Sequence, residues 1–222
     1  GGWVAPSVPR GIKALNVAAP AQTPRIVLID RPQSPQSVII GAQALDVTGR
    51  ADLVVANAAN EAIGGGFLSR INQDIRETRG WSYGLGGNIQ MREGQALYMI
   101  QAPVQSDRTG ESIAVLLQQY RDFAGERGVT QAERDRIVGG NVGQLPGRFE
   151  TSAAVLGALR SNALYGRPDN YWETLGPRYQ ALTAAEMDAA ARAVVDPEAF
   201  VWVVVGDASV VRPKLEALGL PI

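Results

Sequence analysis

Apolar residues recur along the chain with two different spacings, and these spacings predict where strands and helices lie. Short apolar or alternating runs bounded by turn residues are typical of strands, and apolar residues spaced three and four apart are typical of helices. The runs that predict strands are 25–30, 37–46, 82–92, 95–105 and 199–207. The segments that predict helices are 50–63, 67–79, a stretch from 107 onward, 150–166 and the residues after Asp207. The two central strands are joined at Glu93 and Gly94, which predicts a hairpin.

Several helix boundaries are also written in the sequence. Thr130 and Thr183 are each followed three residues later by Glu, the capping-box pattern that begins a helix. Gly80 stands just after the predicted helix 67–79, where a left-handed residue commonly ends a helix. Strict alternation of strand and helix is missing, so we expect an α+β fold with a mostly antiparallel sheet.

The chain divides into two parts by composition. Residues 1–24 hold four prolines and show no sustained periodicity, which predicts a linker or extended arm. Residues 25–222 are then expected to form one domain. The first residue is not Met and the opening residues do not match a signal peptide, so a processed product or a fragment is expected.

Composition excludes several classes of function. The 222 residues contain no His and no Cys, so a Ser-His-Asp triad, a thiolate nucleophile and an autonomous zinc site are all disfavoured. The net charge is −1, so no basic field is present to attract nucleic acid or an anionic membrane. No apolar run is long enough to span a bilayer. We therefore expect no metal ligand in this chain and neither nucleic acid nor membrane as a partner.

One block of sequence carries a family resemblance. "GGGFLSRINQDIRETRGWSYG", residues 64–84, resembles the signature of zinc-free domains in the pitrilysin (insulinase) peptidase family, of the mitochondrial-processing-peptidase type. In that signature a Gly-rich turn leads into Ser-Arg-Leu-x-x-x-Leu-Arg-Glu-x-x-Gly-x-x-Tyr. The order of the predicted elements agrees from about residue 25 to 218. The resemblance implies a two-layer domain with helices packed on one side of the sheet.

The resemblance also implies a role at a site completed by another domain. Family members are clamshells whose zinc lies in a separate half, so zinc and a zinc-bearing peptidase half, on the same chain or a separate subunit, are expected as partners of this chain. An Arg and a Tyr from the zinc-free half support the reaction by holding the carbonyl of the peptide substrate, and Arg76 and Tyr83 match them in type and spacing. Ser82, Gly84 and Gly86 share one strand face without large side chains, where a substrate backbone can come close. A periplasmic or secreted location is implied by resemblance alone.

Other interpretations of the same residues stay open. Tyr83 alternates in phase with Leu85 and Ile89, which also fits a core aromatic residue. Arg76 also fits an ordinary surface arginine, and Arg70 and Asp74, four apart, predict a surface ion pair. If the chain is instead the second domain of the zinc-bearing half, Arg76 and Tyr83 are structural.

Three further alternatives concern function. The turn at 64–66 resembles an anion-binding loop but lacks the Lys and Ser/Thr of a P-loop, so a packing turn is favoured. The carboxylates of Glu61, Asp74 and Glu77 are better explained as solvated helix faces than as a hard-metal site. A non-catalytic peptide-binding or assembly scaffold of the same fold is the alternative to a part of a peptidase.

Overall fold

The computed structural model describes residues 22–222 and, before them, residues 2, 4, 7 and 11. The predicted arm at 1–24 therefore lies largely outside the described residues. The described elements begin at Arg25 and end at Glu216.

Five strands form one mixed sheet in the order β1-β5-β2-β4-β3. Their bounds are β1 Arg25–Asp30, β2 Gln36–Ala44, β3 Gly86–Gln90, β4 Leu97–Gln105 and β5 Val201–Gly206. Only β1 and β5 run parallel, and every other pair is antiparallel. The predicted hairpin is present as β3 and β4, although β3 is shorter than the predicted strand at 82–92. The mostly antiparallel α+β prediction is confirmed.

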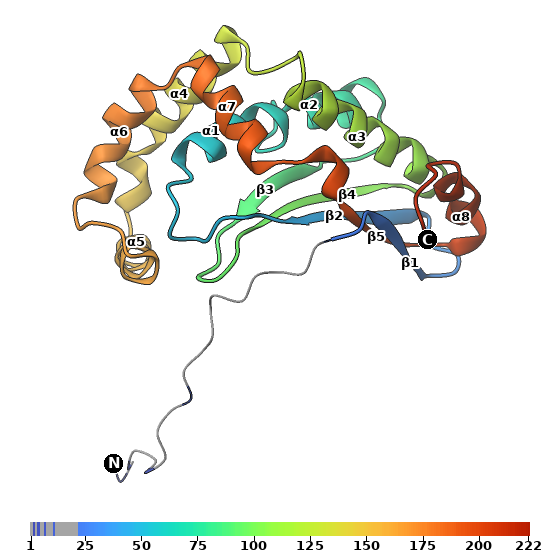
Figure 1. Cartoon of the computed structure of the whole chain (residues 1–222), viewed down its shortest axis with the longest axis horizontal. Coiled ribbons are helices and arrows are strands. Elements are labelled where there is room, and N and C mark those ends of the chain that lie inside the picture. The colour runs from blue at the N-terminus through green and yellow to red at the C-terminus, as the bar shows by residue number, and fades with distance from the viewer. Residues whose placement is uncertain (1, 3, 5–6, 8–10, 12–21) are drawn as a thin grey trace.

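Helices cover one face of this sheet (Figure 1). The α-helices are α1 Val54–Ile63, α2 Arg70–Asn72, α3 Thr109–Ala124, α4 Gln131–Gln144, α5 Ser152–Tyr165, α6 Tyr171–Ala181, α7 Ala184–Val194 and α8 Ala208–Glu216. Short connecting turns are η1 Gln73–Thr78, η2 Ser106–Arg108, η3 Pro146–Phe149 and η4 Pro197–Ala199. Both predicted capping boxes are confirmed, at Thr130 with Glu133 and at Thr183 with Glu186.

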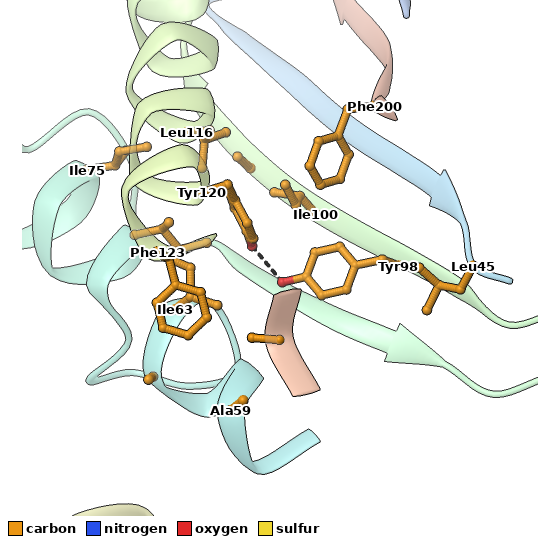
Figure 2. Packing of buried hydrophobic residues seen from close by; sticks show 14 of the residues in the cluster. Leu45, Ala59, Ile63, Ile75, Tyr98, Ile100, Leu116, Tyr120, Phe123 and Phe200 are labelled. Atoms are coloured by element: carbon orange, nitrogen blue, oxygen red, sulfur yellow. Dashed lines mark hydrogen bonds between the residues drawn. The ribbon is translucent and has the colours of Figure 1, made fainter. Parts of the chain in front are cut away.

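The core lies between the sheet and these helices. Its largest fully buried side chains are Trp202, Tyr98, Tyr120 and Phe200. The rings of Tyr98 and Tyr120 meet edge to face, with centroids 5.7 Å apart, and both contact Phe200 in the same manner. Figure 2 shows the two tyrosine hydroxyls pointing toward one another among Ile63, Leu116 and Phe123. The apolar residues that alternate along β2, β4 and β5 supply the floor of this core because every second side chain faces the helices.

Helix α5 is an exception to this burial. Of its residues only Asn162 is buried, while Leu156 and Leu159 are 66% and 61% exposed. Figure 1 shows the helix at the opposite end of the molecule from α8, clear of the sheet. It is anchored at its C-terminal end, where the Tyr165 hydroxyl donates to the Met91 carbonyl. An apolar helix surface therefore lies open on one side of the domain.

Candidate functional site

A groove of about 620 Å³ lies where the C-terminal end of α1 meets the edge strand β3. Its lining is made of glycines and amide side chains with a single ionisable group among them, Glu61. The lining residues are Asn57, Asn60, Glu61, Gly64, Gly65, Gly66, Gly84, Leu85, Gly86, Gly87, Asn88, Gln101 and Pro103. The groove therefore lies between two glycine-rich stretches of the chain, 64–66 and 84–87.

The glycines are needed where α1 and β3 touch. The Gly87 amide donates a 2.8 Å hydrogen bond to the Gly64 carbonyl, and the Asn60 side chain donates one of 2.8 Å to the Gly87 carbonyl. A β-carbon at Gly87 would lie 2.6 Å from the hydroxyls of both Tyr98 and Tyr120. A β-carbon at Gly86 would lie 3.1 Å from the Gly64 carbonyl oxygen. Close approach of two backbones, not phosphate binding, explains these residues.

Beneath the strand, a buried polar chain supports this contact. The Tyr98 hydroxyl lies 2.5 Å from Asn60 Oδ1, to which it donates, and 2.7 Å from the Tyr120 hydroxyl. Burial raises the pKa of Tyr98 well above its ordinary value, and burial likewise raises the pKa of Tyr120. Both phenols are therefore neutral at physiological pH. Their chemistry here is hydrogen bonding that holds Asn60, and through it Gly87, in place.

The outer edge of β3 is closed by the chain itself along this stretch. Gly87 has both backbone groups bonded to α1 and the residue that follows it, and the Leu85 amide donates to Asn72 Oδ1 at 3.3 Å. An added strand needs free amides and carbonyls at the edge it joins. The backbone groups of Gly87 and the Leu85 amide are therefore not free to pair with an added strand.

Arg76 lies on a π-helical turn that the sequence pattern did not predict. The predicted helix 67–79 is present but shorter: it begins at Arg70 as α2 and continues without a break as the π-helical turn η1 to Thr78. The Arg79 amide bonds to the Asp74 carbonyl at 3.0 Å, five residues back, as this wider turn requires. Turns of this type occur often at functional sites because they change the direction of a side chain without ending the helix.

The Arg76 side chain is 32% exposed, and its Nε lies 3.4 Å from Glu77 Oε1. Its guanidinium carbon lies 4.3 Å from the centroid of the Phe67 ring. It makes no hydrogen bond to any other described residue. Its N–H groups are therefore available to a ligand.

Tyr83 projects from the surface. Its side chain is 88% exposed, so the interpretation as a core aromatic residue is wrong. Gly80 has φ of +67°, which confirms the predicted left-handed residue at the break between the helix and the strand. The Tyr83 hydroxyl has no hydrogen-bond partner within the part of the chain that the structure describes.

Some of the predicted site residues line the groove and others lie outside it. Gly84 and Gly86 line the groove, whereas Ser82, Arg76 and Tyr83 are not among its lining residues. The Ser82 hydroxyl donates to the Pro103 carbonyl at 2.5 Å and accepts from the Gly84 amide at 3.1 Å. Ser82 thereby fixes the backbone that carries Tyr83 and Gly84. No direct hydrogen bond joins Arg76 to Tyr83 in the described structure.

The predicted surface pair of Arg70 with Asp74 is wrong. Arg70 instead forms a two-point contact with Glu133 at 2.7 Å for each bond and also donates to the carbonyls of Arg127 and Gly128. Asp74 pairs with Arg79 at 2.6 Å. Burial opposes ionisation of Glu133, but bonds from Arg70 and Thr130 outweigh it and lower the pKa of Glu133 to about 2. This partly buried network ties α2 to the start of α4 because a forked guanidinium can satisfy several acceptors at once.

Asn60 is a groove residue that the sequence pattern did not single out, and Glu61 was considered only as one of three carboxylates of a possible metal site. Burial raises the pKa of Glu61, although Asn141 donates to its carboxylate at 2.7 Å. The sequence does contain a signal for the buried contact of Asn60: Asn57 and Asn60 lie three apart in a run of alanines and valines. An amide side chain within an apolar helix face needs a buried hydrogen-bond partner. The three carboxylates considered as a metal site are held by separate partners. Among the described residues, no group of three or more metal-ligating side chains comes together.

Comparison with known proteins agrees with this geometry. Residues 7–140 match the family described as the peptidase M16 inactive domain. An uncharacterized zinc protease of Mycobacterium tuberculosis is 26% identical over 171 residues, which cover 77% of this chain and 38% of the relative. The peptidase M16 inactive domain of Pseudomonas fluorescens superposes with a TM-score of 0.79 at 23% identity, over 90% of this chain and 48% of that one. The periplasmic protease PqqL of Escherichia coli superposes with a TM-score of 0.69 at 14% identity, over 90% of this chain and 23% of that one.

The chain has the fold of the peptidase M16 inactive domain with which it superposes. The chain belongs to the peptidase M16 inactive domain family, which confirms the resemblance to pitrilysin-type peptidases. It spans less than half the length of the relatives reported above. Within the described residues, no helix is both long and apolar enough to cross a membrane.

Proposed function

We propose that this chain forms one wall of a peptide-binding chamber and supplies Arg76 and Tyr83 to peptide hydrolysis at a zinc site carried by another domain or subunit. The observation that carries the proposal is the exposure of Tyr83, 88%, beside a groove that begins at the next residue. Arg76, seven residues before Tyr83 in the sequence, keeps its guanidinium free of hydrogen bonds to the described part of its own domain.

These two side chains suit one chemical task. Cleavage of an amide bond builds negative charge on the carbonyl oxygen of the substrate, and fixed donors aimed at that oxygen lower the barrier. Arg76 brings a permanent positive charge with forked N–H donors, and Tyr83 brings one O–H donor. Zinc, held in the other half, would supply the Lewis acid and the activated water for the same bond. Gly84 and Gly86 leave room for the peptide backbone along the groove.

The apolar surfaces of the domain support the expected partner. Leu156 and Leu159 on α5 are exposed, and so are Val27 and Ile29 on β1, whose side chains point away from buried Ile26. Apolar surface of this kind usually marks a protein interface. A second peptidase half packed against these surfaces would bury them.

The proposal is tested by peptide turnover of the complete protein with its zinc half. Arg76→Gln is expected to lower kcat about a hundredfold, in the range for loss of one donor to the developing charge. Arg79→Gln is the matched control, because Arg79 lies on the same turn but is already bound to Asp74. Equal activity of the two variants would contradict the proposal. If the complete protein binds peptides without cleaving them, the non-catalytic peptide-binding scaffold is the correct function.

A further inference from the structure

Phe67 stands out because it is large, apolar and 59% exposed, yet its backbone is firmly held. Its carbonyl accepts a 2.7 Å bond from Asn72 Nδ2 and a longer one from Gln73 Nε2. Asn72 is buried and also accepts from the Leu85 amide through Oδ1. The Asn72 side chain thus links the turn that holds Phe67 to the backbone at Leu85, just before β3.

The exposed ring has a defined neighbour. The Arg76 guanidinium carbon lies 4.3 Å from the ring centroid, well inside the distance of about 6 Å at which a cation interacts with an aromatic face. A guanidinium stacked on a ring keeps its N–H groups in its own plane, so they stay free for a carbonyl or carboxylate. Glu77 meets only Nε, at 3.4 Å. The other donors of Arg76 have no hydrogen-bond partner in the described structure.

We propose that Phe67 is a positioning residue for Arg76: its ring holds the guanidinium in one orientation, with the N–H edge directed to the carbonyl of a bound peptide. This inference rests on the proposed function of Arg76. An unrestrained arginine loses about 2 kcal/mol of rotamer freedom when it is fixed. A side chain already held by stacking loses less on meeting the substrate, and this difference favours the transition state.

A second arginine on the same turn provides an internal comparison. Arg79 stacks on Trp81 at 4.8 Å, but it is also bound to Asp74 at 2.6 Å. Its orientation is set by a carboxylate, and its guanidinium has no free role at the groove. Weakening this second stack is therefore expected to leave catalysis unchanged.

The test replaces Phe67 by phenylalanines with one, two and three ring fluorines in the complete protein with its zinc half. Fluorination withdraws charge from the ring face and barely changes its size, so packing is kept while the attraction for a cation falls. We expect kcat/KM to fall in steps to about one half to one fifth of the wild-type value, mostly through kcat. Fluorotryptophan at position 81 is the control and should retain full activity. In an Arg76→Gln background, the fluorine series should have no further effect.

The outcomes separate the two proposals. If Arg76→Gln is impaired and the fluorine series is flat, the positioning role of Phe67 is overturned while the function of Arg76 stands. A flat series together with a large loss in Phe67→Ala would show that the ring serves packing against the other half, which also overturns positioning. If Arg76→Gln itself retains full activity, the proposed function fails, and the role of Phe67 fails with it.

Discussion

The side-chain amide of Asn60 donates a 2.8 Å hydrogen bond to the carbonyl of Gly87, 27 residues further along the chain. The same side chain accepts from the Tyr98 hydroxyl, so one buried residue links α1, the glycine strand and the aromatic core. The groove owes its shape to this link, because it sets how closely α1 approaches β3.

Removal of this link should destabilise the domain. Asn60→Ala removes the side-chain donor to the Gly87 carbonyl and leaves the Tyr98 hydroxyl with Tyr120 as its one remaining partner among the described residues, and we expect a loss of about 2–4 kcal/mol in the free energy of unfolding. Asn57→Ala is the control on the same helix, since its side chain donates only to the Leu53 carbonyl one turn earlier. Its loss should be below about 1 kcal/mol. Urea unfolding measures both, and equal losses would contradict a special role for Asn60.

Substitutions at two glycines distinguish peptide binding in the groove from the stability of the fold. A β-carbon at Gly84 meets nothing within 4 Å, whereas one at Gly87 would collide with two buried hydroxyls. Gly87→Ala should therefore lower stability by about 1–3 kcal/mol through overpacking. Gly84→Val should change stability by less than about 0.5 kcal/mol, yet raise KM for peptides because its side chain enters the groove. An unchanged KM in Gly84→Val would show that peptides do not occupy this groove.

The contact of Arg70 with Glu133 makes stability depend on pH. Hydrogen bonds from Arg70 and Thr130 overcome the effect of burial and hold the pKa of Glu133 at about 2, below its ordinary 4.5. A lowered folded-state pKa stabilises the fold above 4.5, and this stabilisation is lost as the pH falls toward 2. Unfolding measured from pH 6 to 2.5 should show a steep loss that Glu133→Gln removes. Glu93→Gln, at a more exposed contact with Arg50, should keep the wild-type slope.

The contribution of Glu61 to stability should change with pH in the opposite direction from that of Glu133. Burial raises the pKa of Glu61 above 4.5, and bonding from Asn141 and the charges of Arg136 and Arg148 only partly oppose this. Its ionised form thus opposes folding at neutral pH, and that cost disappears as the pH falls below the ordinary value. Glu61→Gln should therefore be more stable than wild type at pH 7 and no more stable near pH 3.5. Greater stability of the wild type at pH 7 would contradict this assignment.

Periodicity and capping residues were sufficient for most of the fold. Strand β1 and the two capping boxes lie where the pattern placed them because alternation and local hydrogen bonds act within a few residues. The π-helical turn η1 did not follow from the pattern, since the apolar spacing of Ile71 and Ile75 fits an ordinary helix equally well.

The candidate site was predictable only in part. Arg76 and Tyr83 came from a motif, and Gly84 and Gly86 came from their shared strand face, but alternation alone placed Tyr83 in the core. Strand β3 begins only at Gly86, so Tyr83 lies before the strand and the alternation of strand faces does not apply to it. Long-range partners were beyond local reasoning: Arg70 pairs with Glu133 across 63 residues, not with Asp74 on its own turn.

The most direct test of the account is kcat of the complete protein with Tyr83→Phe at unchanged zinc content. The change removes one exposed hydroxyl that has no partner in the described structure, so folding should be unaffected. We expect kcat to fall about a hundredfold, as for other single donors to a developing oxyanion. Tyr165→Phe, which loses only a bond to the Met91 carbonyl, should keep full turnover. A Tyr83→Phe enzyme with wild-type kcat would contradict a catalytic contribution from this domain.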